Sequence, residues 1–143
     1  MASIWESDTL WKTIAVLTRP MKGFENRAFR KMRTLSPAEV AKRSEALRGC
    51  ELHHFQSSPY SKRARRALAR NQVEIPMYDI LEDDAAHARL VAGGKKDLVP
   101  CLHIRETGKP DVWMYQSLRI VKFIDDRVAG KILPVESYFE KDA

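Results

Sequence analysis

The sequence predicts an α/β protein in which helices flank one four-stranded mixed sheet, preceded by a helical N-terminal extension. Residues 1–49 show helical apolar spacing and contain no convincing strand. After residue 49, β-type and helical runs follow one another in the order βαβ, α, ββ, α. A helix joins the first two strands, so we expect them to be parallel with a right-handed crossover. A tight turn between the last two strands makes them antiparallel.

Three helices are expected in the extension. Apolar spacing over residues 10–17 and 24–35 indicates the first two, which Pro20 separates because the residue before a proline is pushed out of the helical region. The third begins at a capping box over residues 36–39, with proline at its first helical position. Gly49 is placed to end it.

The remaining elements follow from local signals. They are a strand over 52–55, a helix over 58–70, a strand over 73–80, a helix over 83–92, a strand over 99–105, a strand over 112–115 and a helix over 117–128. Pro76 suggests an edge strand or a bulge, and Gly93 and Gly94 are expected to end the fourth of these elements. We therefore divide the chain into a basic helical extension (1–49), one domain (50–128) and a short tail (129–143).

Composition excludes several classes of protein. Hydrophobic residues make up 44% of the 143 residues and charged residues 31%, which is typical of a globular chain and argues against global disorder. No apolar run approaches the roughly 20 residues that cross a bilayer, and Glu6 and Asp8 stand where a signal peptide would be positive and apolar. Two cysteines are too few to staple a secreted scaffold. We expect a cytoplasmic protein, with peripheral membrane association as an open alternative.

The net charge of +6 is uneven, because residues 1–49 hold 10 basic and 5 acidic side chains while residues 50–143 hold 15 and 14. One interpretation of the basic extension is a solvated face; the other is a surface for an anionic membrane or a protein partner. Nucleic acid is the less favoured partner. The five cations between Lys62 and Arg70 spread around a helix and are expected mainly on a solvated face, with one or two near a bound ligand's carboxylate.

Three short motifs are expected to meet at one end of the sheet. They are Ser58-Pro59-Tyr60-Ser61 at a helix start, Val99-Pro100 at a strand start, and Gln116-Ser117 at the start of the last helix. In this order the motifs resemble the glutaredoxins and the N-terminal domains of glutathione S-transferases, over residues 50–128. The resemblance implies a thioredoxin-like (glutaredoxin-like) fold.

The same resemblance implies that glutathione is a ligand or cosubstrate. It assigns the binding site to Ser58, Pro59, Tyr60, Val99, Pro100, Gln116 and Ser117. In the family the Val-Pro peptide bond is cis and leaves the valine backbone free to pair with glutathione, while the Gln-Ser pair holds the γ-glutamyl end. A helix N-terminus with a hydroxyl and free N–H groups suits such a carboxylate.

Ser58 and Ser61 stand where glutaredoxins carry cysteine. A serine hydroxyl cannot form a mixed disulfide, so dithiol and monothiol exchange at this motif are excluded. Ser58 then has two interpretations: a hydrogen-bond donor to the glutathione thiolate, as in serine-type transferases, or a helix cap without catalysis. A third is that both serines replace cysteines by engineering.

Two functional hypotheses follow. The first is a glutathione-binding protein without dithiol redox activity; the second is an enzyme, a serine-type glutathione S-transferase or a thiol-transfer protein, working as a dimer or alone. Nucleic-acid binding through residues 19–48 is a third class. Cys50 and Cys101 are expected as free thiols, and no metal site is expected because His53 and His54 point to opposite faces of a strand.

Overall fold

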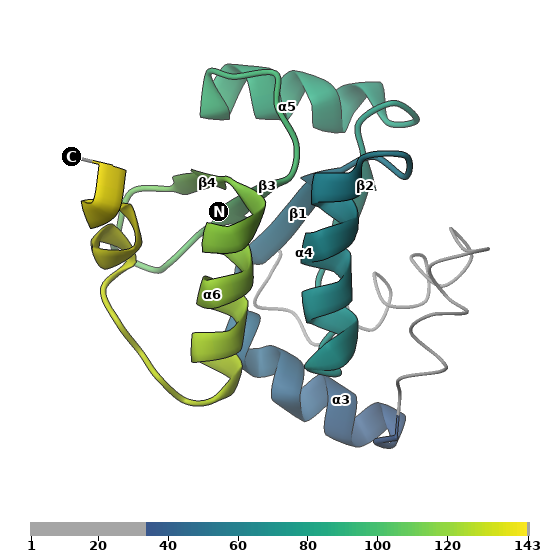
Figure 1. Cartoon of the computed structure of the whole chain (residues 1–143), viewed down its shortest axis with the longest axis vertical. Coiled ribbons are helices and arrows are strands. Elements are labelled where there is room, and N and C mark those ends of the chain that lie inside the picture. Colours follow the sequence, from purple (N-terminus) through teal and green to yellow (C-terminus); the bar gives the residue numbers. More distant parts are fainter. Residues whose placement is uncertain (1–33, 143) are drawn as a thin grey trace.

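The computed structural model describes residues 34–142, and Figure 1 shows their arrangement. The helices are α3 (Pro37–Ser44), α4 (Pro59–Arg70), α5 (Asp84–Gly94) and α6 (Ser117–Val128), with the 3-10 turns η2 (Glu45–Leu47) and η3 (Val135–Asp142). The strands are β1 (Cys50–His54), β2 (Met77–Asp79), β3 (Cys101–Ile104) and β4 (Val112–Tyr115). The helices predicted over 10–17 and 24–35 begin outside the described residues.

The four strands form one sheet in the order β2-β1-β3-β4. β1 and β2 are parallel, whereas β3 is antiparallel to both β1 and β4. This is the mixed sheet of a thioredoxin-like fold, and the prediction of fold class is confirmed. No helix of the described chain is long and apolar enough to span a membrane.

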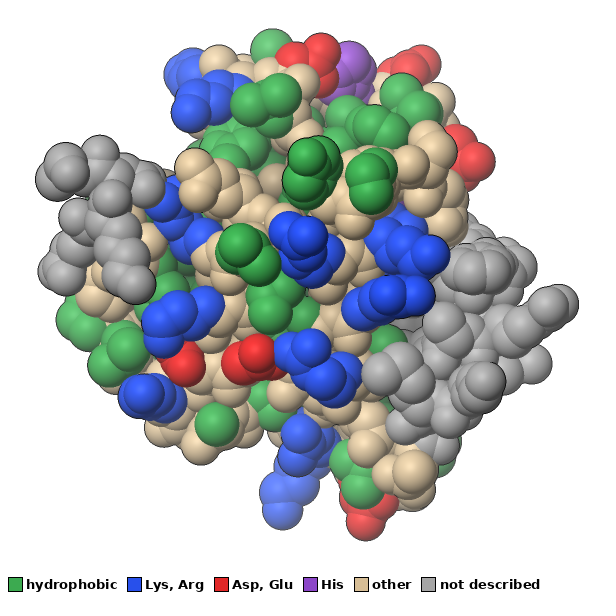
Figure 2. Space-filling view, in the orientation of Figure 1, with side chains coloured by type: hydrophobic (Ala, Val, Ile, Leu, Met, Phe, Trp, Pro, Cys, Tyr) green, Lys and Arg blue, Asp and Glu red, His purple; other side chains and the backbone are tan. Residues whose placement is uncertain are grey.

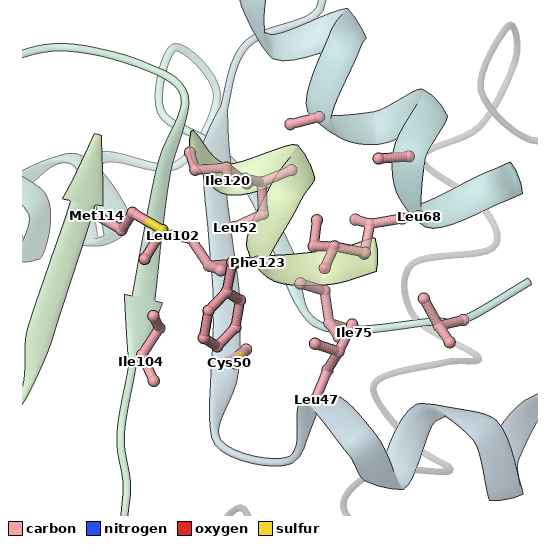
Figure 3. Close-up of a cluster of buried hydrophobic side chains, with 14 of the residues drawn as sticks. Leu47, Cys50, Leu52, Leu68, Ile75, Leu102, Ile104, Met114, Ile120 and Phe123 are labelled. Atoms are coloured by element: carbon pink, nitrogen blue, oxygen red, sulfur yellow. The ribbon is translucent and has the colours of Figure 1, made fainter. Parts of the chain in front are cut away.

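Helices cover both faces of the sheet. α4 and α6 lie on one face, where Leu52, Leu102 and Phe123 belong to the larger core cluster (Figure 3). α5 covers the other face, where Leu90 packs with Cys101 in a smaller cluster. The buried apolar side chains of α6 are Ile120, Phe123 and Ile124, whereas Leu118, which the sequence spacing places on the apolar side, is exposed.

The part of the extension that the structure describes packs against the domain. Ser36 and Glu39 form the predicted capping box at the start of α3. The Oε1 atom of Gln72 accepts hydrogen bonds from the backbone N–H groups of Thr34 (2.7 Å) and Leu35 (2.9 Å). Leu47, in the turn after α3, is 1% exposed and belongs to the main core.

Two predicted strands are too long. The strand expected over 73–80 is limited to Met77–Asp79, because Pro76 has no N–H group for the ladder. Val73 and Ile75 nevertheless bury their side chains in the main core. The strand expected over 99–105 begins only at Cys101, again directly after a proline.

The predicted end of a helix at Gly93 and Gly94 is confirmed, because α5 ends at Gly94. The left-handed residue that follows is Lys95, with a φ of 64°, and not one of the glycines. A Cβ atom at Gly93 would overlap the Trp113 ring, and one at Gly94 would overlap the Tyr115 hydroxyl. The glycines are needed because they let the end of α5 approach β4 closely.

The two cysteines lie at opposite ends of the β1–β3 ladder, as predicted. Cys50 pairs with Ile104 and Cys101 pairs with His53, and both thiols are buried and free. Burial raises the pKa of each thiol to about 12. Neither cysteine therefore supplies a thiolate at neutral pH.

Candidate functional site

The register of the strands brings the three motifs to one end of the sheet. Cys101 pairs with His53 on one side and with Tyr115 on the other. Val99-Pro100 directly precedes β3, so it lies at the end of the sheet where β1 and β4 both end. Ser58 follows the end of β1 by four residues, and Gln116 follows β4 directly.

The first motif begins α4. Ser58 is the N-cap, and its Oγ accepts a hydrogen bond from the N–H group of Ser61 at 3.2 Å. Pro59 occupies the start of the helix, where a missing N–H group does no harm. Ser58 is only 5% exposed, whereas Tyr60 is 60% exposed. The local cap predicted from the sequence is present, and the Ser58 hydroxyl proton is not used by that cap.

The third motif, Gln116-Ser117, begins α6 through an unusual backbone conformation. Gln116 is the N-cap, with φ 72° and ψ 116°, and its side chain makes no capping hydrogen bond. A non-glycine residue in such a region stores of order 1–3 kcal/mol of strain, and such residues cluster at functional sites. The first N–H groups of α6 have no side-chain cap, so they form a positive end suited to an anion.

Arg63 connects the two helix starts, a role that the sequence did not reveal. Its Nη1 donates a hydrogen bond to the Oγ of Ser117 at 2.9 Å. The guanidinium carbon also lies 5.9 Å from the centre of the Tyr60 ring. Within residues 34–142 no carboxylate pairs with Arg63, so its charge adds to the positive end of α6.

Arg63, Arg66 and Arg70 are exposed, in agreement with the expectation of a mainly solvated face, and Arg65 is the exception. Arg65 is 9% exposed and donates hydrogen bonds to the carbonyl oxygens of Phe55 (3.2 Å) and Gln56 (3.1 Å). These two hydrogen bonds hold the loop between β1 and α4 against the buried side of α4. Arg70 pairs with Asp125 of α6 at 2.6 Å. Sequence spacing places these residues on a helix but does not show which carbonyl or carboxylate lies opposite them.

The second motif, Val99-Pro100, forms the wall between the two helix starts and α5. The peptide bond between Val99 and Pro100 is cis. Val99 is half-buried and Pro100 is buried, and Val99 packs with the smaller core cluster. The neighbouring Tyr115 hydroxyl donates to the carbonyl oxygen of Lys96 at 3.1 Å, and burial raises its pKa. These groups give the wall its shape, with no titratable group available near neutral pH.

A second polar cluster lies under α5, on the sheet face away from α4 and α6. The His103 ring lies between Glu51 (2.8 Å) and Asp111 (2.9 Å) and stacks on Trp113. Burial opposes ionisation of Glu51, yet the hydrogen bond from His103 and the nearby positive charges together lower its pKa. Within residues 34–142 no three acidic, histidine or cysteine side chains are arranged to hold a metal ion.

His53 and His54 point to opposite faces of β1, as predicted. His53 lies beside Trp113 and Tyr78, and both of its ring nitrogens are buried without a hydrogen-bond partner among residues 34–142. His54 lies on the α4 side, where its Nδ1 is 3.2 Å from Arg65. Burial lowers the pKa of each ring to about 4, so both are neutral at pH 7.

Comparison with known proteins agrees with this architecture. The model of one family, described as glutathione S-transferase, N-terminal domain, matches residues 52–131. The match runs from β1 to just beyond α6 and so includes all four strands and all three motifs. Neither the curated proteins nor the solved structures contain a significant match.

Proposed function

The chain belongs to the glutathione S-transferase N-terminal domain family, and on that premise we propose that it binds glutathione where α4 and α6 begin. The ligand contacts all three motifs at this end of the sheet. Dithiol exchange is not part of the proposal, because serine occupies both positions where that chemistry requires cysteine. The proposed function is therefore ligand binding without redox cycling at this motif.

The start of α6 is the proposed site for the γ-glutamyl carboxylate. The free N–H groups of the first turn, the Ser117 hydroxyl and the Arg63 guanidinium can all donate to one anion. The observation that carries the proposal is the strained backbone of Gln116, the residue directly before Ser117 at the start of α6. A helix start needed only for folding would be served by an ordinary cap.

The rest of the ligand follows from the other two motifs. The backbone of Val99 is the proposed partner of the glutathione backbone, beside the ring of Pro100. The thiol then lies towards Ser58, with Tyr60 at the exposed rim of the site.

Calorimetric titration of the full chain with reduced glutathione tests the proposal. We expect saturable binding that Ser117→Ala weakens about tenfold, since a hydrogen bond to a charged group contributes roughly 1.5–3 kcal/mol. Ser137→Ala is the matched control, because Ser137 bonds only to the carbonyl oxygen of Pro134 and lies far along the chain from the motifs. No heat at millimolar glutathione, or equal loss in both variants, would contradict the proposal.

A second candidate function is thiolate activation, as in serine-type transferases. The observation that favours it is the Ser58 hydroxyl, whose oxygen caps α4 while its proton stays free to donate. Ultraviolet absorbance of bound glutathione measures the thiolate near neutral pH. We expect Ser58→Asp to abolish the thiolate signal while keeping the helix cap, whereas Ser58→Ala also loses about 1 kcal/mol of stability. Binding without any thiolate signal would leave the non-catalytic function.

A further inference from the structure

The outer sides of α4 and α6 form an exposed basic surface. The two helices lie side by side in front of the sheet, and no other described element crosses them in Figure 1. Figure 2, in the same orientation, shows Lys and Arg side chains gathered over them. We call this surface the α4–α6 basic face; its cations are Lys62, Arg63, Arg66, Arg70, Arg119 and Lys122.

The acidic side chains of α6 neutralise only one end of this face. Asp125 accepts hydrogen bonds from Arg70 (2.6 Å), and Asp126 accepts from Lys122 (3.1 Å). Both carboxylates lie in the second half of α6. Towards the helix starts, Arg63 bonds to a neutral hydroxyl, and Arg66 has no hydrogen bond or ion pair within residues 34–142. Among the described residues, the positive charge without a carboxylate partner that this comparison identifies is therefore that of Arg63 and Arg66, beside the candidate site.

Large apolar side chains stand among these cations. Tyr60 at the start of α4 is 60% exposed, and Leu118 at the start of α6 is 69% exposed. An exposed mixture of apolar and cationic groups on two packed helices is typical of a protein-binding surface. A partner that is complementary to this surface is a segment with an apolar stripe that is flanked by carboxylates.

The charge of this protein excludes two occupants. Residues 1–33 hold 7 basic and 3 acidic side chains, so they repel the basic face. A second copy that docked symmetrically would bring two such faces together, with the same result. The occupant is therefore a different polypeptide.

Nucleic acid fits this face less well, because binding to its backbone rests on cations that contact successive phosphates. Asp125 and Asp126 interrupt such a run of cations along these helices.

We propose that the α4–α6 basic face docks an acidic, amphipathic helical segment of another protein. Its carboxylates lie against Arg66 and Lys122, and its apolar stripe covers Leu118. This goes beyond glutathione binding and does not depend on it, since none of these three residues belongs to the proposed glutathione site.

Fluorescence anisotropy of the full chain with a synthetic peptide tests the proposal. The probe is a labelled helix of about 20 residues with Leu and Glu at helical spacing, and its twin carries Gln in place of Glu. We expect saturable binding of the acidic probe and none of the Gln twin. Arg66→Glu combined with Lys122→Glu is expected to weaken binding at least about tenfold, because it places repulsive charges in the interface.

The matched control combines Lys95→Glu with Lys109→Glu. Both double variants change the net charge by the same amount. Arg66 and Lys95 are each an exposed cation. Lys122 and Lys109 each belong to an ion pair, with Asp126 and Glu106 respectively. We expect the control to bind as the wild type does. Equal weakening in both variants, or no binding to the wild type at about 1 mM probe, would overturn the proposal. So would tighter binding of duplex DNA or of anionic phosphatidylserine vesicles that only the face variant loses.

Discussion

At Gln116 the chain turns from β4 into α6 through a backbone conformation that residues with a Cβ atom rarely adopt. Natural sequences replace such a residue with glycine unless its side chain is needed, because glycine adopts positive φ without steric strain. We therefore propose that ligand binding, rather than folding, explains the glutamine. This separates the effect of a substitution on stability from its effect on binding.

We predict that Gln116→Gly stabilises the protein while it weakens glutathione binding. The variant relieves backbone strain, which raises the free energy of unfolding by about 0.5–1 kcal/mol after the added entropy of the unfolded chain is counted. The amide that is proposed to contact the ligand is lost at the same time. Urea unfolding and calorimetry measure the two effects separately, and Gln116→Ala serves as the comparison because it keeps the strain. A less stable glycine variant with intact binding would contradict this account.

The buried histidines of β1 predict a loss of stability in mild acid. Burial lowers the pKa of His53 and His54 from 6.5 to about 4, so the unfolded chain binds more protons than the folded one between these values. The free energy of unfolding therefore falls as the pH decreases from about 6.5 to 4, by roughly 1.4 kcal/mol per pH unit for each ring. Urea unfolding at several pH values measures the slope.

A histidine substitution tests the origin of that slope. His53→Leu is expected to remove about half of it, because one of the two buried rings no longer titrates. The control is His87→Leu, since His87 lies on the exposed side of α5 and pairs with Asp97. If both variants keep the full slope, His53 is not responsible.

At the scale of single elements, the close approach of α5 to β4 reverses an ordinary rule for helices. Alanine normally stabilises an exposed helix position relative to glycine by about 1 kcal/mol. At Gly93 the added Cβ would overlap the Trp113 ring, which belongs to the stack on His103. The packing of the neighbouring strand therefore decides the sign of the substitution.

We predict that Gly93→Ala destabilises the protein by about 1–3 kcal/mol, as overpacking does elsewhere. A double-mutant cycle with Trp113→Leu tests the cause, because the smaller side chain makes room for the methyl group. In the Trp113→Leu background, Gly93→Ala is expected to be neutral or stabilising. An equal penalty in both backgrounds would mean that the contact with Trp113 is not the reason.

At the scale of the whole molecule, the described part of the extension belongs to the core of the domain. Leu47 is 1% exposed among the side chains that line α6 and β1 (Figure 3). Residue Ser44 reinforces this junction, because its Oγ accepts a hydrogen bond from the N–H group of Glu74 at 2.8 Å. Where the extension ends and an independent domain begins stays a prediction of the sequence.

We predict that Leu47→Ala lowers the free energy of unfolding by about 2–5 kcal/mol, the range for a buried leucine that leaves a cavity. Leu81→Ala is the control, because Leu81 is 69% exposed. Its effect is expected to stay within about 0.5 kcal/mol. Equal small effects in both variants would show that the junction contributes little to stability.

Helix starts and helix lengths could be predicted from the sequence alone, because they depend on neighbouring residues. Ser36, Ser58 and Asp83 each cap the helix that was predicted to follow them. The period of the apolar residues gave α6 its observed bounds, and the order of the three motifs identified the family. These signals act within one or two turns of chain, so they survive without knowledge of the packing.

The contacts and the backbone strain of the candidate site could not be predicted from the sequence, because they depend on how distant elements pack. The hydrogen bond from Arg63 to Ser117 joins residues 54 positions apart, and it depends on how α4 and α6 pack against each other. The strain at Gln116 likewise depends on the direction in which β4 meets α6. Contacts between distant segments are set by the packing of whole elements, and no local pattern of residue types encodes them.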